Sequence, residues 1–369
     1  MLIGIDLLWV RPGICGGTES YIRNLLTGFG TYDSENQYVL FTAQDNADTF
    51  EAYREYGNFS LVICPVDCAK QEKRILWENL HLDRYAKKHN IELMFIPVYS
   101  KPISWGSKIA YVTVIHDLQA LHYPEYFSKL RNAFFRLEWW YATKASKHIV
   151  AISDYGKGDL IKRYPWVADR ISTIYDPIIS QKSEVDFDKL TRKYHVQSGQ
   201  YYYCVSSMLP HKNLKTILEV VALFKRQGRN IPLVVSGVGG NAENFWDRVN
   251  QLDIADMVIN TGFVSDEERD CLYENCKLFL FPSIFEGFGM PPVEAMRKGK
   301  RVVMTKKACL YEVSDRQAVY VDDPYDLNEW VERINYAERQ PERVLEFEQY
   351  SLKVISEKFI ELFRRVFEK

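Results

Sequence analysis

Short apolar runs alternate with helical patterns along most of the chain. Helical spacing of apolar residues is present over 18–29 and 74–89. The apolar runs have the length of strands and lie at 2–5, 38–42, 61–64, 91–96, 109–115, 149–152 and 171–174. Alternation of this kind predicts parallel sheets whose strands are connected by crossover helices.

A polar stretch at 176–200 interrupts this pattern, which then starts again. Further strands are predicted at 201–205, 231–236, 257–260, 278–281 and 301–304, and helices at 213–227, 242–252, 266–275 and from Pro292. We therefore expect an α/β protein with two Rossmann-like, doubly wound domains at 1–176 and 200–345. Ligands of open α/β folds bind beyond the carboxyl ends of the strands, which predicts a ligand site in a cleft between the domains.

Composition narrows the class of protein. The chain has 369 residues, more than the ~250–300 that a single core usually supports. A net charge of −2 gives no reason to expect nucleic acid as a partner. The seven cysteines are an odd number and have no CxxC spacing, which favours the reducing cytoplasm. The apolar N-terminus has no basic leader, so it predicts a buried strand and not a signal peptide, and no run reaches the ~18 apolar residues of a membrane span.

The first candidate site is the glycine-rich segment GICGGT at 13–18, where a strand passes into a helix. Gly16 and Gly17 would let the backbone approach a ligand closely, and the first N–H groups of the helix can bind an anion. The alternative is a flexible turn that has no function.

The second candidate is the strand that ends in His116 and Asp117. Polar side chains at the carboxyl end of such a strand face the ligand site. The alternative is that His116 satisfies a backbone group and Asp117 caps the next helix.

The third candidate is Lys212, in the loop SSMLPHKN at 206–213 that leads into a helix. A positive charge near a helix N-terminus is unfavourable, so a lysine there suggests an anionic ligand. The alternative is a solvated lysine.

The segment SIFEGFGMPPVE at 283–294 is the most specific signal. Gly287 and Gly289 let the backbone wrap around a ligand, and the two following prolines suit a helix start whose N–H groups can hold a diphosphate. A carboxylate accepts two hydroxyl hydrogens of a vicinal diol, so Glu286 and Glu294 suit a sugar ring and a ribose. A structural role at the helix dipole would explain Glu294 but not Glu286.

The segment GVGGNA at 237–242 fits a dinucleotide-binding fingerprint. However, the next strand, at 257–260, ends without the acid that would hold a cofactor ribose. We therefore expect no nicotinamide cofactor. The loop at Gly237 is a candidate for lining the pocket of a nucleobase.

Taken together, these motifs resemble the retaining glycosyltransferases of family 4, which have the GT-B fold, and in particular members that build bacterial surface polysaccharides. Glu286 and Glu294 match the EX7E motif of that family, and segments at 16–18, 114–118, 151–154, 262–268 and 281–283 follow in the family's order. The resemblance covers nearly the whole chain. It implies transfer of a hexose, with retention, from a nucleotide-sugar donor to a glycan or a lipid-linked saccharide.

The resemblance also assigns roles to residues. It implies that Lys212 contacts the donor diphosphate, that Glu286 holds the sugar and that Glu294 holds the ribose. With His116 near the donor sugar, it makes His116, Lys212 and Glu286 the catalytic residues. The further donor-binding residues are Gly16, Gly17, Ser207, Gly237, Val264, Gly287, Phe288, Gly289 and Met290, and Thr18 and Asp117 are assigned to the acceptor side. The resemblance further implies that a final helix at 350–369 returns to the N-terminal domain.

Two departures bear on the donor. Ser207 and His211 stand where many family members carry arginine. This difference and the HKN sequence favour mannose or rhamnose, while glucose and galactose stay open. No DxD-type acidic pair follows a strand near the phosphate site, so we expect no metal cofactor. The alternatives to a transferase are a non-catalytic nucleotide-sugar-binding protein and a GT-B-type epimerase or phosphorylase.

Residues 130–147 combine four cations with several aromatic side chains on one predicted helix. Such a helix can lie at a membrane surface, which would place the protein at the inner face of the plasma membrane. The alternative is an ordinary packing helix with solvated cations.

Overall fold

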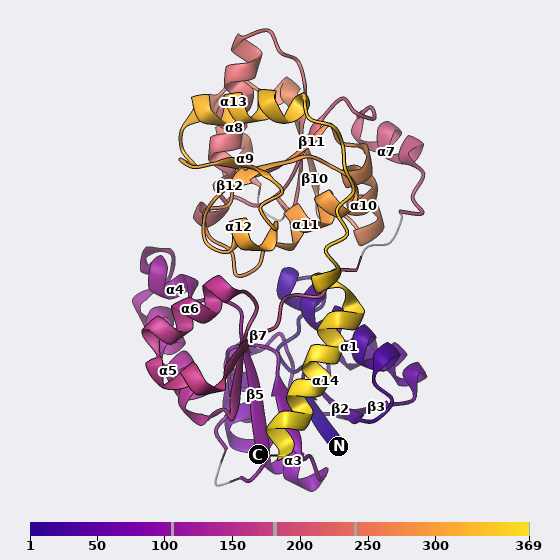
Figure 1. Cartoon of the computed structure of the whole chain (residues 1–369), viewed down its shortest axis with the longest axis vertical. Coiled ribbons are helices and arrows are strands. Elements are labelled where there is room, and N and C mark those ends of the chain that lie inside the picture. Colours follow the sequence, from indigo (N-terminus) through magenta and orange to yellow (C-terminus); the bar gives the residue numbers. More distant parts are fainter. Residues whose placement is uncertain (105–106, 180–182, 240–241, 369) are drawn as a thin grey trace. The chain divides into compact units, whose positions relative to one another are not determined.

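The structure is a computed structural model and describes residues 1–104, 107–179, 183–239 and 242–368. It divides into two compact units, Met1–Ile179 with Glu348–Lys369, and Ser180–Phe347. Each unit contains one parallel β-sheet with helices packed against it (Figure 1). The predicted α/β class with two doubly wound sheets is therefore confirmed.

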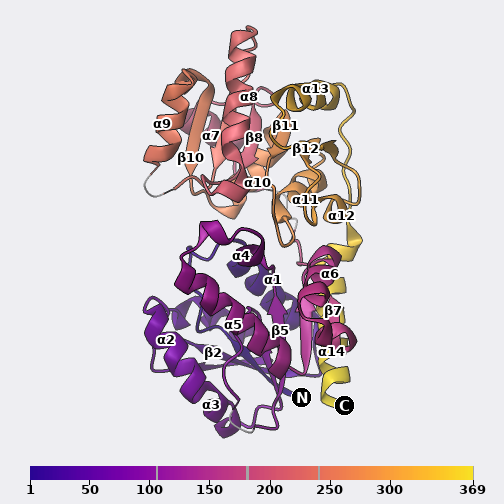
Figure 2. The same cartoon turned by 90° about the vertical axis from the view of Figure 1, so that its left-hand side faces the viewer.

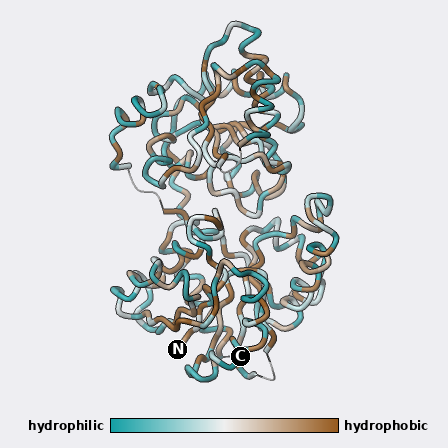
Figure 3. Tube along the Cα trace, turned by 180° about the vertical axis from the view of Figure 1, so that it is seen from behind, coloured by the Kyte–Doolittle hydropathy of each residue, from teal (hydrophilic) through white to brown (hydrophobic). Residues whose placement is uncertain are grey.

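The sheet of the first unit has the strand order β3-β2-β1-β4-β5-β6-β7. Its strands are β1 (Leu2–Asp6), β2 (Gln37–Thr42), β3 (Phe59–Ile63), β4 (Leu93–Ile96), β5 (Ala110–Ile115), β6 (His148–Ala151) and β7 (Ile171–Thr173). Most of these strands are buried on both faces, which explains why they are continuous apolar runs (Figure 3). The direction of the connections reverses between β1 and β4, so the carboxyl ends of these two strands form the switch point of the sheet.

Helices cover both faces of this sheet. They are α1 (Gly17–Tyr32), α2 (Gln71–Trp77), α3 (Asp83–Lys88), α4 (Gln119–His122), α5 (Lys129–Ala145), α6 (Asp154–Arg163) and α14 (Leu352–Glu368), with 3-10 turns at Ala47–Tyr56, Pro124–Tyr126 and Pro165–Arg170. The single helix expected at 74–89 begins earlier, at Gln71, and a π-turn at Glu78–Leu82 separates α2 from α3.

The sheet of the second unit has the order β10-β9-β8-β11-β12-β13. Its strands are β8 (Tyr202–Val205), β9 (Leu233–Ser236), β10 (Val258–Gly262), β11 (Leu278–Phe281), β12 (Val302–Thr305) and β13 (Val319–Val321). Its helices are α7 (Phe187–Tyr194), α8 (Leu214–Arg226), α9 (Glu243–Gln251), α10 (Asp266–Asn275), α11 (Met290–Arg297), α12 (Leu310–Val313) and α13 (Leu327–Glu338). The switch point lies between β8 and β11.

Two expectations about this second unit need correction. The polar stretch at 176–200 is not only a connection, because it contains α7, which Asp186 caps and whose Leu190 is buried. Helix α11 begins at Met290 and not at Pro292, because Gly289 adopts the left-handed conformation that ends the preceding loop.

Helix α14 belongs to the first unit and lies along α1 (Figure 1). The contact is aromatic: the ring of Phe29 lies 6.0 Å from that of Phe359 and 5.8 Å from that of Phe363. It is also close, since a Cβ atom on Gly28 would lie 2.0 Å from Oγ of Ser356. The two helices can approach to this distance only because residue 28 has no side chain.

We predict that Gly28→Ala destabilises the first unit by ~1–3 kcal/mol, because overpacking outweighs the gain in helix propensity of ~1 kcal/mol. Urea unfolding measures the change. Gly158→Ala in α6 is the matched control, since nothing lies within 4 Å of its Cβ position, and it should be neutral or stabilising. Ser356→Ala should restore part of the loss in Gly28→Ala. A stable Gly28→Ala protein would contradict the packing described here.

Candidate functional site

In the second unit, the structure brings Lys212 and Glu286 into direct contact. Nζ of Lys212 lies 2.8 Å and 3.0 Å from the two carboxylate oxygens of Glu286. Lys212 follows β8 and Glu286 follows β11, and these strands are neighbours in the sheet. Both side chains keep some contact with solvent, with 27% and 12% of their surface exposed. The pair therefore marks an accessible polar point at the carboxyl ends of the two central strands.

The loop that carries Glu286 is held by contacts on both sides. The backbone N–H of Ile284 donates to the carbonyl of His211, which ties this loop to the loop of Lys212. Sγ of Cys309 lies 3.2 Å from the carbonyl oxygens of both Glu286 and Phe288. The position of Glu286 is thus fixed by its backbone as well as by its ion pair.

The start of α11 has fewer free backbone N–H groups than the sequence suggested. The helix begins with Met290, followed by Pro291 and Pro292, neither of which has an N–H group. Gly289 has a φ of 88°, a conformation that favours glycine, and a Cβ there would lie 2.7 Å from Cδ2 of Leu310. Backbone donors for an anion must therefore come from the glycine loop and Met290.

Glu294 lies in the second turn of α11 and has partners that the sequence did not reveal. The hydroxyl of Tyr273 donates a hydrogen bond to its Oε2 at 3.0 Å. Nε of Arg269 lies 3.5 Å from the same oxygen. Both partners come from α10, where Tyr273 is fully buried, and the carboxylate raises the pKa of the Arg269 guanidinium. Glu294 therefore has one oxygen fixed by α10.

Three serine hydroxyls lie near the same strand ends. Among the described residues, Oγ of Ser206, Ser207 and Ser283 are buried and have no hydrogen-bond partner. Buried hydroxyls are nearly always paired, so these three favour a ligand with oxygen acceptors here. Ser207 is the residue at which the resemblance leads us to expect arginine.

His211 does not supply a positive charge at this site. Burial and the nearby charge of Lys212 lower the pKa of His211 to about 4. The imidazole is therefore neutral at neutral pH, and Lys212 is the cation at this point.

The loop after β9 shows why Gly237 is needed. Its φ is 96°, and a Cβ there would lie 2.7 Å from the carbonyl oxygen of Ser206. The ring of Phe263 packs on Gly239 and is 75% exposed, while the predicted Val264 beside it is half-buried. Phe263 is an exposed aromatic side chain that was not among the site residues predicted from the sequence. Gly240 and Asn241, from the same glycine-rich segment, lie outside the described residues.

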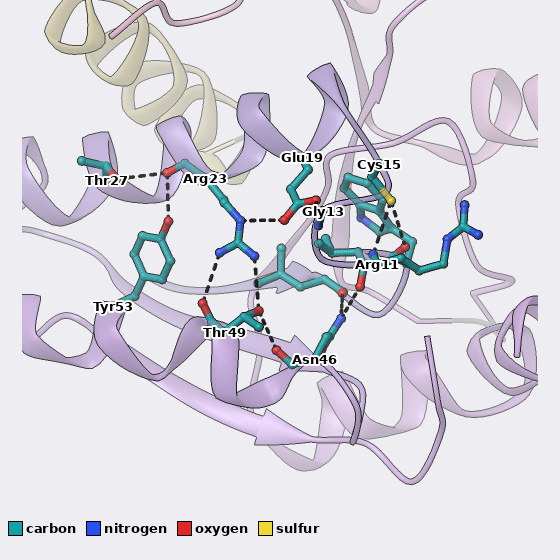
Figure 4. A network of polar contacts seen from close by, with 12 residues as sticks. Arg11, Gly13, Cys15, Glu19, Arg23, Thr27, Asn46, Thr49 and Tyr53 are labelled. Carbon is teal, nitrogen blue, oxygen red and sulfur yellow. Dashed lines mark hydrogen bonds and ion pairs between the residues drawn. The ribbon is translucent and has the colours of Figure 1, made fainter. Parts of the chain in front are cut away.

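In the first unit, the glycine loop is held by a polar network (Figure 4). Glu19 accepts the N–H of Gly13 at 2.9 Å and pairs with Arg23 at 2.9 Å, and Arg23 in turn donates to Thr49. Gly16 caps α1 with φ 57° and ψ −135°, a conformation that needs glycine. Gly16 and Gly17 are exposed and Thr18 is half-buried, so the backbone of the loop stays accessible.

His116 lies at the end of β5 and contacts the helix that follows the glycine loop. Its Nε2 lies 2.8 Å from the carbonyl oxygen of Pro97, so Nε2 carries the proton and donates. Its ring meets that of Tyr21 in α1 edge to face at 4.9 Å. Burial lowers the pKa of His116 to about 4, which keeps it neutral with Nδ1 as an acceptor. Asp117 accepts the backbone N–H of Gln119 at 2.8 Å and so does cap the following turn.

Models of known families match almost the whole chain. The model described as Glycosyltransferase Family 4 matches residues 15–181, and the model described as Glycosyl transferases group 1 matches residues 186–354. The chain belongs to glycosyltransferase family 4. The two parallel sheets are those of the family's GT-B fold.

Curated relatives of this family member include two enzymes of O-antigen synthesis. The O-antigen chain mannosyltransferase RfbU of Salmonella typhimurium is 28% identical over 64% of this chain and 63% of its own length. O-antigen chain mannosyltransferase B of Escherichia coli is 30% identical over 59% of this chain and 58% of its own length. The chain thus matches less than two thirds of either relative. Anabaena HepE, solved in complex with UDP-glucose, has the same fold, with a TM-score of 0.70 at 16% identity over 99% of this chain and all of its own.

No group of three or more His, Cys, Asp or Glu side chains in the described part of the chain could hold a metal ion. No helix within the described ranges is long and apolar enough to cross a membrane.

We predict that Tyr273→Phe raises the Kd of a nucleoside diphosphate roughly fivefold, because Glu294 loses a hydrogen bond of about 1 kcal/mol. Calorimetric titration measures the change. Tyr203→Phe is the control, since that buried hydroxyl bonds Ser236 and not Glu294. The effect should disappear with a 2′,3′-dideoxy nucleotide, because we expect Glu294 to hold the ribose diol that this nucleotide lacks. Equal losses for both nucleotides would assign Tyr273 a purely structural role.

Proposed function

We propose that this family 4 protein is a retaining hexosyltransferase that uses a nucleotide-sugar donor. The second unit binds the donor: Lys212 contacts the diphosphate, Glu286 the sugar and Glu294 the ribose. His116 of the first unit acts on the donor sugar, and Gly16 and Gly17 approach the phosphate or the acceptor. The acceptor is a glycan or a lipid-linked saccharide, and the protein works in the cytoplasm at the inner face of the membrane. None of the seven cysteines forms a disulfide within the described residues, which supports the cytoplasm as the compartment.

The observation that carries the proposal is the contact between Lys212 and Glu286. A donor sugar is bonded directly to its diphosphate, so a cation for the phosphate and a carboxylate for the sugar must lie side by side. The hydroxyls of Ser206, Ser207 and Ser283 have no hydrogen-bond partner among the described residues, which supports an oxygen-rich ligand at the same strand ends. A nicotinamide cofactor would need an acid at the end of β10, where Asn260, Thr261 and Gly262 stand.

Mannose is the sugar that we propose for the donor. The two relatives described above are named mannosyltransferases, and Ser207 and a neutral His211 set this chain apart from members that have arginine there. HepE was solved with UDP-glucose, so a glucose donor is the second candidate.

We further propose that turnover needs no metal ion. Lys212, backbone N–H groups and the serine hydroxyls can offset the charge of the leaving diphosphate. The leaving phosphate itself can take the proton of the acceptor hydroxyl, so the side chains need not supply a separate base.

The proposal is tested by a thermal-shift screen of GDP-, dTDP- and UDP-sugars, followed by product analysis with and without an acceptor. We predict that a mannose donor stabilises the protein most and that transfer continues in the presence of a chelator. Loss of transfer in chelator, restored by magnesium or manganese, would reject the metal-independent mechanism. Binding of donors without turnover on any acceptor would favour a binding protein, and products from donor alone an epimerase.

Substitution of the two glutamates should affect different kinetic constants. Glu294→Ala should lower the affinity for the donor by about ten- to a hundredfold, since a hydrogen bond to a charged group contributes ~1.5–3 kcal/mol. It should leave kcat largely unchanged, because the ribose contact is the same in the ground state and the transition state. Glu286→Ala should lower kcat most. It should not weaken binding of the free nucleoside diphosphate, because that ligand has no sugar for Glu286 to hold and competes with Glu286 for Lys212.

Titration with free nucleotide and full donor kinetics on both variants check this prediction. Weaker nucleotide binding in Glu286→Ala alone would reverse the two roles, and two unaffected variants would reject the EX7E assignment. Glu312→Ala, which alters a half-buried acid of α12, is the control for general effects on this unit.

A further inference from the structure

Helix α5 of the first unit has one buried face and one exposed apolar face. Phe135 and Trp139 pack into the core of the unit. On the other side, Leu130 is 82% exposed, Leu137 60% and Trp140 47%. These three residues recur at helical spacing and form a single stripe, which we call the α5 stripe. Burial in the unit thus accounts for only part of the apolar surface of this helix.

The surroundings of the stripe are cationic. Residues 129–147 contain five lysines and arginines against one acid, Glu138, whereas the net charge of the whole chain is −2. Lys144 lies over the ring of Trp166 at 3.8 Å, and this tryptophan is itself 38% exposed. Apolar side chains between exposed cations are the pattern of a helix that lies in a lipid interface.

A cavity of about 380 Å³ opens beside the stripe, between α4, α5 and α6. It is lined by Leu121, His122, Arg136, Asp159, Lys162 and Arg163. His122 and Asp159 bond each other at 2.6 Å, so three cations face the cavity with one acid that is already paired. Lys162 and Arg163 also end α6, where the helix dipole favours cations, but Arg136 lies in the middle of α5 and has no such reason.

We propose that the first unit docks on an anionic lipid surface through α5. Leu130, Leu137 and Trp140 enter the interface, and the cavity with Arg136, Lys162 and Arg163 receives a lipid phosphate. Figure 2 shows α5 crossing the face of the first unit that is turned to the viewer. The docking itself is argued from α5 and its neighbours. Only its use rests on the proposed function, since a lipid-linked acceptor would lie in such a surface.

Charge complementarity favours lipid over a second copy of the chain. A second copy would bring the same cations to face those of the first, and like charges would repel at the rim of the stripe. An anionic bilayer supplies the opposite charge and the apolar layer together, and each lysine or arginine near it strengthens the attraction.

Vesicle sedimentation of the full chain tests the inference. The protein should bind vesicles of phosphatidylcholine with equimolar phosphatidylglycerol, and bind much less to phosphatidylcholine alone or at high salt. Arg136→Gln/Lys162→Gln should weaken binding to the anionic vesicles roughly tenfold or more. Leu137→Ser/Trp140→Ser should weaken it at least as much, because the inserted apolar area is lost.

The matched control is Tyr336→Ser/Arg339→Gln, which removes an aromatic residue of 50% exposure and an adjacent cation from the second unit. It should bind vesicles as the unaltered protein does. All variants should keep nucleotide binding and the turnover of a water-soluble acceptor, which separates failure of this inference from failure of the proposed function. Vesicle binding that is absent, or equal in all variants, would overturn the inference. So would a stripe variant that changes only the oligomeric state.

Discussion

The switch point of each parallel sheet determines where chemistry can take place in this protein. At that point neighbouring strands send their connections to opposite faces, and the loops leave a space between them. In the second unit, the loops after β8 and β11 meet there, which is why Lys212 and Glu286 touch although 74 residues separate them in the sequence. In the first unit, the glycine loop follows β1 and Pro97 follows β4, so the bond from His116 to the Pro97 carbonyl fixes this histidine next to the switch point.

The polar groups at these points remain available to a ligand, because only part of their hydrogen-bonding capacity is used within the protein. Lys212 and Glu286 pair with each other, so neither charge is isolated, and both retain access to solvent. Three serine hydroxyls in the second unit have no partner within the described part of the chain. In the first unit, His116 donates through Nε2 and keeps Nδ1 as a neutral acceptor. A ligand with several oxygens can use such groups without first breaking a large hydrogen-bond network.

Features that depend on the local pattern of apolar residues, such as the strands, could be predicted from the sequence. Side-chain partners and burial, which depend on how the elements pack, could not. Strands β1, β8 and β11 were predicted to within one residue because strands buried on both faces are apolar runs with polar ends. The partners of Glu294 could not be predicted, since Tyr273 and Arg269 reach it only because α10 packs beside α11. For α5, the sequence showed aromatic and basic residues together, but which aromatic residues are buried follows from the angle at which the helix meets its sheet. The neutral state of His211 likewise depends on burial and not on residue type.

The two glutamates of the EX7E motif differ in what holds them, and this difference bears on their roles. Glu294 accepts a hydrogen bond from Tyr273 and forms an ion pair with Arg269, and both partners belong to α10, so its carboxylate has a fixed orientation before any ligand arrives. Glu286 is bonded by Lys212, whose ammonium hydrogens are the same ones that a phosphate would accept. A diphosphate that binds Lys212 therefore competes with Glu286 and releases hydrogen-bonding capacity on its carboxylate. The fixed carboxylate of Glu294 suits a contact that stays the same throughout the reaction. The carboxylate of Glu286, which a phosphate on Lys212 would release, suits a sugar that is bonded to that phosphate.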